Sequence, residues 1–135
     1  MTSESRHVSV RIDRSAEAVY DYASDPSHLP EWAAGLSGSI EQIEGQWVAQ
    51  SPMGTVAVRF VEANEYGVLD HHVTLPSGET VYNPMRVIPD GNSCEVIFTV
   101  RRNPGMTADD FARDVDAVSA DLTTLKQLLE GADLD

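Results

Sequence analysis

Hydrophobic and polar positions alternate along most of the chain, which is typical of half-buried β-strands. The first alternating run covers residues 7–13, where Val8, Val10 and Ile12 share one face. Six further runs cover residues 37–43, 46–52, 55–63, 68–75, 80–88 and 94–102. Glycine, proline and asparagine dominate the breaks between them, and these residues favour tight turns. The pattern therefore predicts seven strands, of which the last six form an antiparallel meander.

Two short helices are predicted between the first and second strands. Ser15 is placed to cap a helix over residues 16–24, which Pro26 must end. A second short helix fits residues 27–35, with Pro30 in its first turns and Gly35 as its stop. These helices are expected to close one end of the sheet.

A long C-terminal helix is predicted because the apolar period changes to 3.6 after residue 106. Thr107 and Asp110 resemble a capping box at its start. Its apolar stripe consists of Phe111, Val115, Val118, Leu122, Leu125 and Leu129. This stripe must pack on another element, and the apolar face of the sheet is the only large candidate.

The order of elements predicts an α+β fold in a single domain over residues 6–130. We expect a seven-stranded antiparallel sheet with the long helix across it, and the first strand beside the last. Residues 1–5 and 131–135 are expected to be frayed termini.

Composition narrows the classes of function. The 135 residues carry a formal net charge of -13, from 22 acidic and 9 basic side chains. Such acidity disfavours binding to nucleic acid or to anionic lipid surfaces. No apolar run reaches transmembrane length, and the polar start does not resemble a signal peptide. One cysteine, Cys94, cannot form an internal disulfide, and we expect a cytoplasmic protein.

The segment "SAEAVYDYASDPSHLPEWAAGL" resembles the N-terminal signature of the START/Bet v 1-like superfamily, also called SRPBCC or polyketide cyclase/dehydrase-like. The matching residues are Val19, Tyr20, Tyr22, Asp25, Pro26, Leu29, Pro30 and Trp32. The resemblance implies a helix-grip fold, in which a curved sheet wraps around the C-terminal helix and leaves a cavity. It does not fix an activity, because the superfamily includes carriers, receptors and cyclases.

Two adjacent histidines are predicted to point to opposite faces of one strand. His71 shares its face with Leu69 and Val73 and should point inward, whereas His72 shares its face with Asp70 and should point to solvent. The pair therefore cannot form a two-ligand metal clip. The other histidines and Cys94 show no ligand spacing, so we expect no metal and no cofactor.

Asn83 is predicted to point into the same interior as His71, because it shares a strand face with Met85 and Val87. Two interpretations remain open for this inward polar pair. The two side chains satisfy each other or a buried water. Alternatively, they line a cavity and orient the polar group of a mostly apolar ligand.

Three hypotheses for the function follow. The first is a binding module for a lipid, an isoprenoid or a polyketide-like ring system. Its candidate ligand-binding residues are His71, Asn83, Trp32, Trp47, Phe60, Met85, Phe98, Phe111, Val115 and Val118. The apolar members of this set are also ordinary core residues by type.

The second hypothesis is an enzyme that resembles the aromatase/cyclases, with His71 as general base or carbonyl polariser. A second inward acid or base near His71 would favour it, and the pattern reveals none, so binding is preferred over catalysis. Nucleophile and nucleotide motifs are missing as well. The third hypothesis is a protein-interaction domain with a solid core. A homodimer through a sheet edge or the outer sheet face stays open.

Overall fold

The structure of the chain is a computed structural model that describes residues 4–36, 39–52 and 54–131. The chain begins with β1 (Ser5–Ile12), α1 (Ala16–Ala23), the 3-10 turn η1 (Pro26–His28), α2 (Leu29–Trp32) and the 3-10 turn η2 (Ala34–Leu36). The strands β2 (Ile40–Ile43), β3 (Gln46–Ser51), β4 (Gly54–Phe60), β5 (His71–Thr74), β6 (Thr80–Asn83), β7 (Met85–Asp90) and β8 (Ser93–Arg101) follow. The long helix α3 (Ala108–Gly131) ends the described chain.

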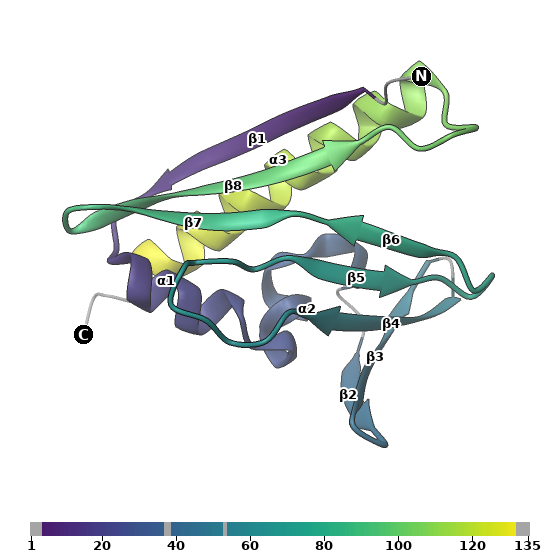
Figure 1. Cartoon of the computed structure of the whole chain (residues 1–135), viewed down its shortest axis with the longest axis horizontal. Coiled ribbons are helices and arrows are strands. Elements are labelled where there is room, and N and C mark those ends of the chain that lie inside the picture. The colour runs from purple at the N-terminus through teal and green to yellow at the C-terminus, as the bar shows by residue number, and fades with distance from the viewer. Residues whose placement is uncertain (1–3, 37–38, 53, 132–135) are drawn as a thin grey trace.

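The strands form two antiparallel sheets rather than the single seven-stranded sheet that the sequence predicted. One sheet has the order β1-β8-β7 and the other has the order β2-β3-β4-β5-β6. The predicted strand over residues 80–88 divides at Pro84 into β6 and β7, which belong to different sheets (Figure 1). Proline lacks the N–H that a continuous ladder needs, so the pairing changes partner at this residue.

The two sheets meet at a short joint between β7 and the segment before β5. The Leu69 amide donates to the Met85 carbonyl at 2.9 Å, and the Val87 amide donates to the Gly67 carbonyl at 2.9 Å. Gly67 has a positive φ of 70°, and a Cβ there would lie 2.2 Å from the Val87 carbonyl oxygen. Only glycine tolerates both the conformation and the close approach, so Gly67 is required at the joint.

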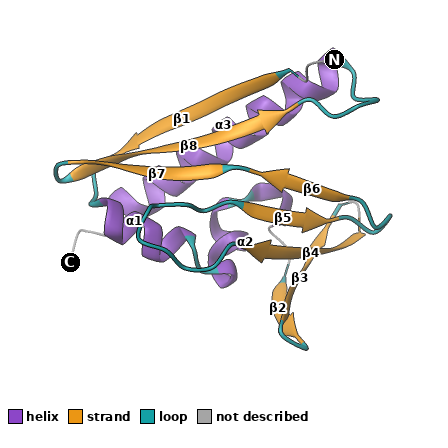
Figure 2. Ribbon diagram, in the orientation of Figure 1, coloured by secondary structure: helices purple, strands orange, loops and turns teal. Residues whose placement is uncertain are grey.

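The helix α3 covers the first sheet, as Figures 1 and 2 show. It packs mainly on β1 and β8, and β1 lies beside β8 as predicted. Four members of its predicted apolar stripe are buried, namely Phe111, Leu122, Leu125 and Leu129. The predicted capping box is present, because the Asp110 amide donates to the Thr107 hydroxyl at 3.0 Å.

The region between β1 and β2 is more broken than the sequence predicted. Ser15 caps α1 as expected, with its hydroxyl accepting from the Ala18 amide at 3.2 Å. The predicted helix over 27–35 is instead the succession η1, α2 and η2. Asp25 caps η1 by accepting from the Ser27 amide at 3.0 Å, so a new turn begins at Pro26.

The ends of the described chain and of β2 differ slightly from the predicted bounds. Of the termini expected to fray, residues 1–3 and 132–135 lie outside the described residues, whereas Ser5 begins β1 and Gly131 ends α3. Residues 37–38, predicted as the start of a strand, also lie outside the described residues, and β2 begins at Ile40.

Candidate ligand-binding cavity

A cavity of about 150 Å³ lies between the second sheet, α2 and α3. Its apolar lining comes from Leu29, Ala33, Leu36, Val58, Val73, Phe98, Val118 and Leu122. Its polar lining comes from Trp32, His71, Asn83 and Asp121. An apolar wall with a few converging polar groups is the usual composition of a small-molecule site.

His71 points inward, as the strand alternation predicted. It is buried, and its ring stacks on Phe60 at 4.7 Å and meets Phe98 edge-on at 5.7 Å between centroids. Its Nδ1 lies 3.0 Å from the Leu69 carbonyl oxygen, which can only accept, so Nδ1 carries the hydrogen. Burial lowers the pKa of His71 and outweighs the bond to Leu69 and the nearby Asp70 charge, which raise it. The neutral ring therefore keeps a free lone pair on Nε2.

Asn83 lies directly opposite His71 on the neighbouring strand β6. The two side chains do not hydrogen-bond to each other among the described residues, and the bond that the His71 ring makes goes to the Leu69 carbonyl. No hydrogen bond of the Asn83 side chain is found within the described residues. Its amide is therefore free to offer a donor or an acceptor to the cavity.

Trp32 supplies the most unusual polar group of the cavity wall. The indole is only 4 % exposed, and its Nε1–H is the one buried side-chain donor without a partner among the described residues. An unsatisfied buried donor costs about 1–3 kcal/mol. A ligand atom that accepts this hydrogen bond would remove the cost.

Asp121 is the polar cavity residue that the sequence analysis missed. Its carboxylate accepts from the Ala34 amide at 3.1 Å, which ties η2 to α3. Burial raises the pKa of Asp121, and the bond from Ala34 only partly opposes this. Helical spacing was the available signal, because Asp121 lies three residues after Val118 and four before Leu125.

The structure brings five of the ten predicted ligand-binding residues to this cavity. These are Trp32, His71, Asn83, Phe98 and Val118. Met85 and Phe111 are buried in the core instead, and Val115 packs half-buried against it. α3 packs mainly on β1 and β8, and its residues Phe111 and Val115 belong to or pack against the core and are not among the residues that line the cavity.

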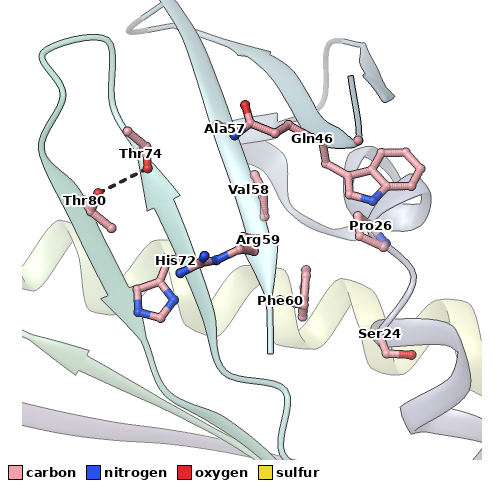
Figure 3. Close-up of a pocket in the computed structure, with 12 residues that line it drawn as sticks. Ser24, Pro26, Gln46, Ala57, Val58, Arg59, Phe60, His72, Thr74 and Thr80 are labelled. Atoms are coloured by element: carbon pink, nitrogen blue, oxygen red, sulfur yellow. Dashed lines mark hydrogen bonds between the residues drawn. The ribbon is translucent and has the colours of Figure 1, made fainter. Parts of the chain in front are cut away.

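Trp47 and Phe60 border a second hollow, a groove of about 490 Å³ whose lining also includes outward side chains of the second sheet. His72 lies in this groove beside Arg59 (Figure 3), which confirms that His72 points away from the interior. Its ring also stacks on Tyr82, with centroids 5.0 Å apart.

Asp70 does not lie in solvent as predicted, although it faces away from His71. It is buried at the joint between the sheets, where its carboxylate accepts from the Met85 amide at 2.9 Å. Tyr82 and Arg86, which lie on the outer face, also donate to this carboxylate. Burial raises the pKa of Asp70, but the bonds from Tyr82 and Met85 and the Arg86 charge together hold it below its usual value.

Two kinds of feature are not found in the described part of the chain. No group of three or more His, Cys, Asp or Glu side chains is arranged to hold a metal ion there. No helix among these residues is long and apolar enough to cross a membrane.

Cys94 is buried, and burial raises the pKa of its thiol.

An α+β architecture with antiparallel sheets and a long C-terminal helix defines the START/Bet v 1-like class, as the sequence resemblance predicted. Residues 5–130 match the family described as polyketide cyclase / dehydrase and lipid transport, and the chain belongs to this family. No curated protein sequence matches the chain.

Solved structures share the fold at low sequence identity. The protein XoxI from Bacillus cereus is 17% identical with a TM-score of 0.74, and the match covers 96% of each chain. A truncated norcoclaurine synthase from Thalictrum flavum is 16% identical with a TM-score of 0.65, over 95% of this chain and 94% of that one. Ara h 8.0201 is 14% identical with a TM-score of 0.67, over 96% and 99%. At these identities the likeness concerns the fold alone.

Proposed function

We propose that this protein binds a small, mostly apolar molecule in the cavity between the sheet and α3. The observation that carries the proposal is the buried indole N–H of Trp32, which has no partner in the described structure and belongs to a residue that lines the cavity. A solid-core interaction domain would have no use for an unsatisfied donor beside an internal space. The family description, which includes lipid transport, also supports binding of an apolar molecule.

The size of the cavity limits the ligand. At about 150 Å³ it has the volume of one apolar ring, since an engineered apolar cavity of about 150 Å³ holds benzene. A lipid tail, an isoprenoid chain or a multi-ring polyketide needs more, because drug-sized ligands occupy about 300–1,000 Å³. We therefore infer a single-ring ligand for the cavity in this conformation.

The polar groups specify what the ring carries. Trp32 offers a donor, and His71 offers the lone pair of Nε2 as an acceptor. A hydroxyl group both accepts and donates, so a phenol-like molecule complements these two groups together. The rest of such a ring would contact Val58, Val73 and Phe98.

The test compares p-cresol with toluene, which has the same shape without the hydroxyl, by isothermal titration calorimetry. We expect p-cresol to bind about tenfold more tightly or better, since a site built to hydrogen-bond a hydroxyl rejects the analogue that lacks it. His71→Leu should keep the fold and reduce this preference. Equal affinity of the wild-type protein for the two molecules would contradict the proposed polar contacts.

A second candidate function is acid–base catalysis, and Asp121 is the observation that favours it. Asp121 lines the same cavity as His71, and its raised pKa increases its protonated fraction. In an intramolecular aldol closure, His71 Nε2 would take the α-proton while the new C–C bond forms. Asp121 would give its proton to the carbonyl oxygen that becomes a hydroxyl.

This candidate can be tested separately from binding. 2,6-Heptanedione closes to a six-membered ring by such an aldol step, and product formation can be followed by absorbance of the enone formed after loss of water. We expect Asp121→Asn to lower the rate by about 10²-fold or more while p-cresol still binds. A wild-type rate equal to that of buffer would remove this candidate.

A further inference from the structure

The open groove on the outer sheet face is distinct from the internal cavity. Its floor is made by outward side chains of three neighbouring strands, namely Ala57, Arg59, His72, Thr74 and Thr80. Pro26 and Trp47 also line it. The groove shares Val58 with the cavity and also reaches Phe60, which stacks on His71, whereas Arg59 and His72 point to the outer face of β4 and β5.

Arg59 is an unusual feature of this floor. The chain has 22 acidic and 9 basic residues. Five of the basic side chains, those of Arg11, Arg86, Arg102, Arg113 and Lys126, form ion pairs with carboxylates. Arg59 forms none with any described residue, although carboxylates are in large excess. Its exposed guanidinium is therefore free for an anion from outside the chain.

His72 places a second donor beside Arg59. The two residues are direct neighbours across β4 and β5, and Figure 3 shows the Arg59 side chain reaching toward His72. The His72 ring is held by stacking on Tyr82. An imidazole carries at least one N–H in the neutral and the protonated forms alike. Two neighbouring donors thus face the groove without a carboxylate between them.

We propose that this groove binds a carboxylate-bearing small molecule with a flat apolar body. The carboxylate would receive the Arg59 fork and an N–H of His72, while the body would lie over Ala57, Thr74 and Thr80, which share the outward face with Arg59. A monoanion is preferred over a phosphate because only one arginine lines the groove. The volume of about 490 Å³ falls within the range of small-molecule sites.

The test uses 2-naphthoate as the probe and 2-naphthamide as its neutral match, with binding to the whole protein measured by calorimetry. We expect naphthoate to bind and naphthamide to bind at least about tenfold more weakly, because only the former has the charge that Arg59 recognises. Arg59→Gln should lower the naphthoate affinity by about tenfold or more. Arg6→Gln is the matched control, since Arg6 is exposed on β1, outside the groove, and has no ion pair with a described residue.

The outcomes separate this proposal from its alternatives. An unchanged naphthoate affinity in Arg59→Gln would overturn it, and so would an equal loss in Arg6→Gln, which would indicate general charge attraction. His71→Leu should leave naphthoate binding unchanged. A loss in His71→Leu as large as in Arg59→Gln would assign the probe to the internal cavity and overturn the groove. If p-cresol fails to bind the cavity, the naphthoate affinities of the wild type and of these variants still test the groove.

Discussion

The two sheets use the same long helix in different ways, and the difference explains where the protein is hollow. Beneath the sheet β1-β8-β7, the interior is filled by Ile12, Val96 and Leu125, which are all 0% exposed. Beneath β4, β5 and β6, the facing residues Val73 and Asn83 are only half-buried, and the cavity separates them from α3. One region is solid core, and the other contains the cavity proposed to bind a ligand.

The sizes of the helix side chains account for this contrast. The C-terminal half of α3 presents Leu122, Leu125 and Leu129, whereas Val115 and Val118 hold the corresponding positions earlier in the helix. Valine is shorter than leucine, and α3 packs on β1 and β8 rather than on β5 and β6. The space left between α3 and the second sheet is closed at one end by Trp32 on α2.

The largest expected effect on stability comes from the solid core beneath the sheet β1-β8-β7. Leu125→Ala should destabilise the protein by about 2–5 kcal/mol, because a fully buried leucine leaves a void in close-packed surroundings. Val118→Ala is the matched change on the hollow side and should cost less than about 1 kcal/mol, since Val118 already borders empty space. Urea unfolding followed by circular dichroism measures both. Similar losses in the two variants would mean that the contrast in packing is wrong.

The joint between the sheets should give the next largest effect. Asp70→Asn keeps an oxygen for the Met85 amide but loses the charge that receives Tyr82 and Arg86. We expect a loss of about 1–2 kcal/mol at pH 7, since Arg86 is partly exposed and keeps some solvation. The same urea titration measures it, and a neutral result would show that the joint does not depend on this charge.

The pH dependence of stability gives a second test of the role of Asp70. The pKa of Asp70 is lower in the folded protein than its ordinary value. Its stabilisation is therefore complete above the unfolded-state pKa of about 3.9 and is lost as pH falls through the folded pKa. The difference in unfolding free energy between wild type and Asp70→Asn should shrink below about pH 4. A difference that stays constant down to pH 2 would contradict the assignment.

The effect of Asp121 on the pH dependence of stability should have the opposite sign. Its pKa is raised in the folded state, so its charge opposes folding, and this penalty is absent below the unfolded pKa and complete above the folded pKa. Asp121→Asn keeps an acceptor for the Ala34 amide. We expect it to be neutral or to stabilise by up to about 1 kcal/mol at pH 7, with no gain at pH 3. Thermal unfolding at the two pH values measures this, and a clear destabilisation at pH 7 would refute it.

The smallest effect is expected on the outer face. His72→Ala removes a half-buried ring that stacks on Tyr82 and fills no core position. The cost should be about 0.5 kcal/mol, as for most surface substitutions. A loss above about 2 kcal/mol would mean that the strand register of β5 is wrong.

The sequence predicted those features that depend on the residue pattern within a single helix or strand. Strand alternation placed His71 inside and His72 outside, and helical spacing identified the apolar stripe with which α3 packs on a sheet. Of the features that depend on two elements, the pairing of β1 with β8 was predicted, but the division of the strands into two sheets was not. This division depends on which strands pair on each side of Pro84.

In the candidate site, too, the features that were missed depend on residues from more than one helix or strand. Asp121 and Trp32 come from different helices, and the sequence does not reveal that both border the space beside His71. The missing partner of the Trp32 indole depends on every surrounding side chain. Asp70 was placed on the correct face but in the wrong environment, because the joint that buries it exists only once the sheets separate.

The most direct test of the cavity follows the indole N–H of Trp32 by nitrogen-15 NMR during titration with p-cresol. The chain has two tryptophans, and Trp47 in the outer groove serves as the internal reference. Trp47→Phe assigns the two signals. We predict a saturable downfield shift of the Trp32 signal, as its N–H gains an acceptor, with the Trp47 signal unchanged. A Trp32 signal that does not move at saturating p-cresol would contradict ligand binding in the cavity.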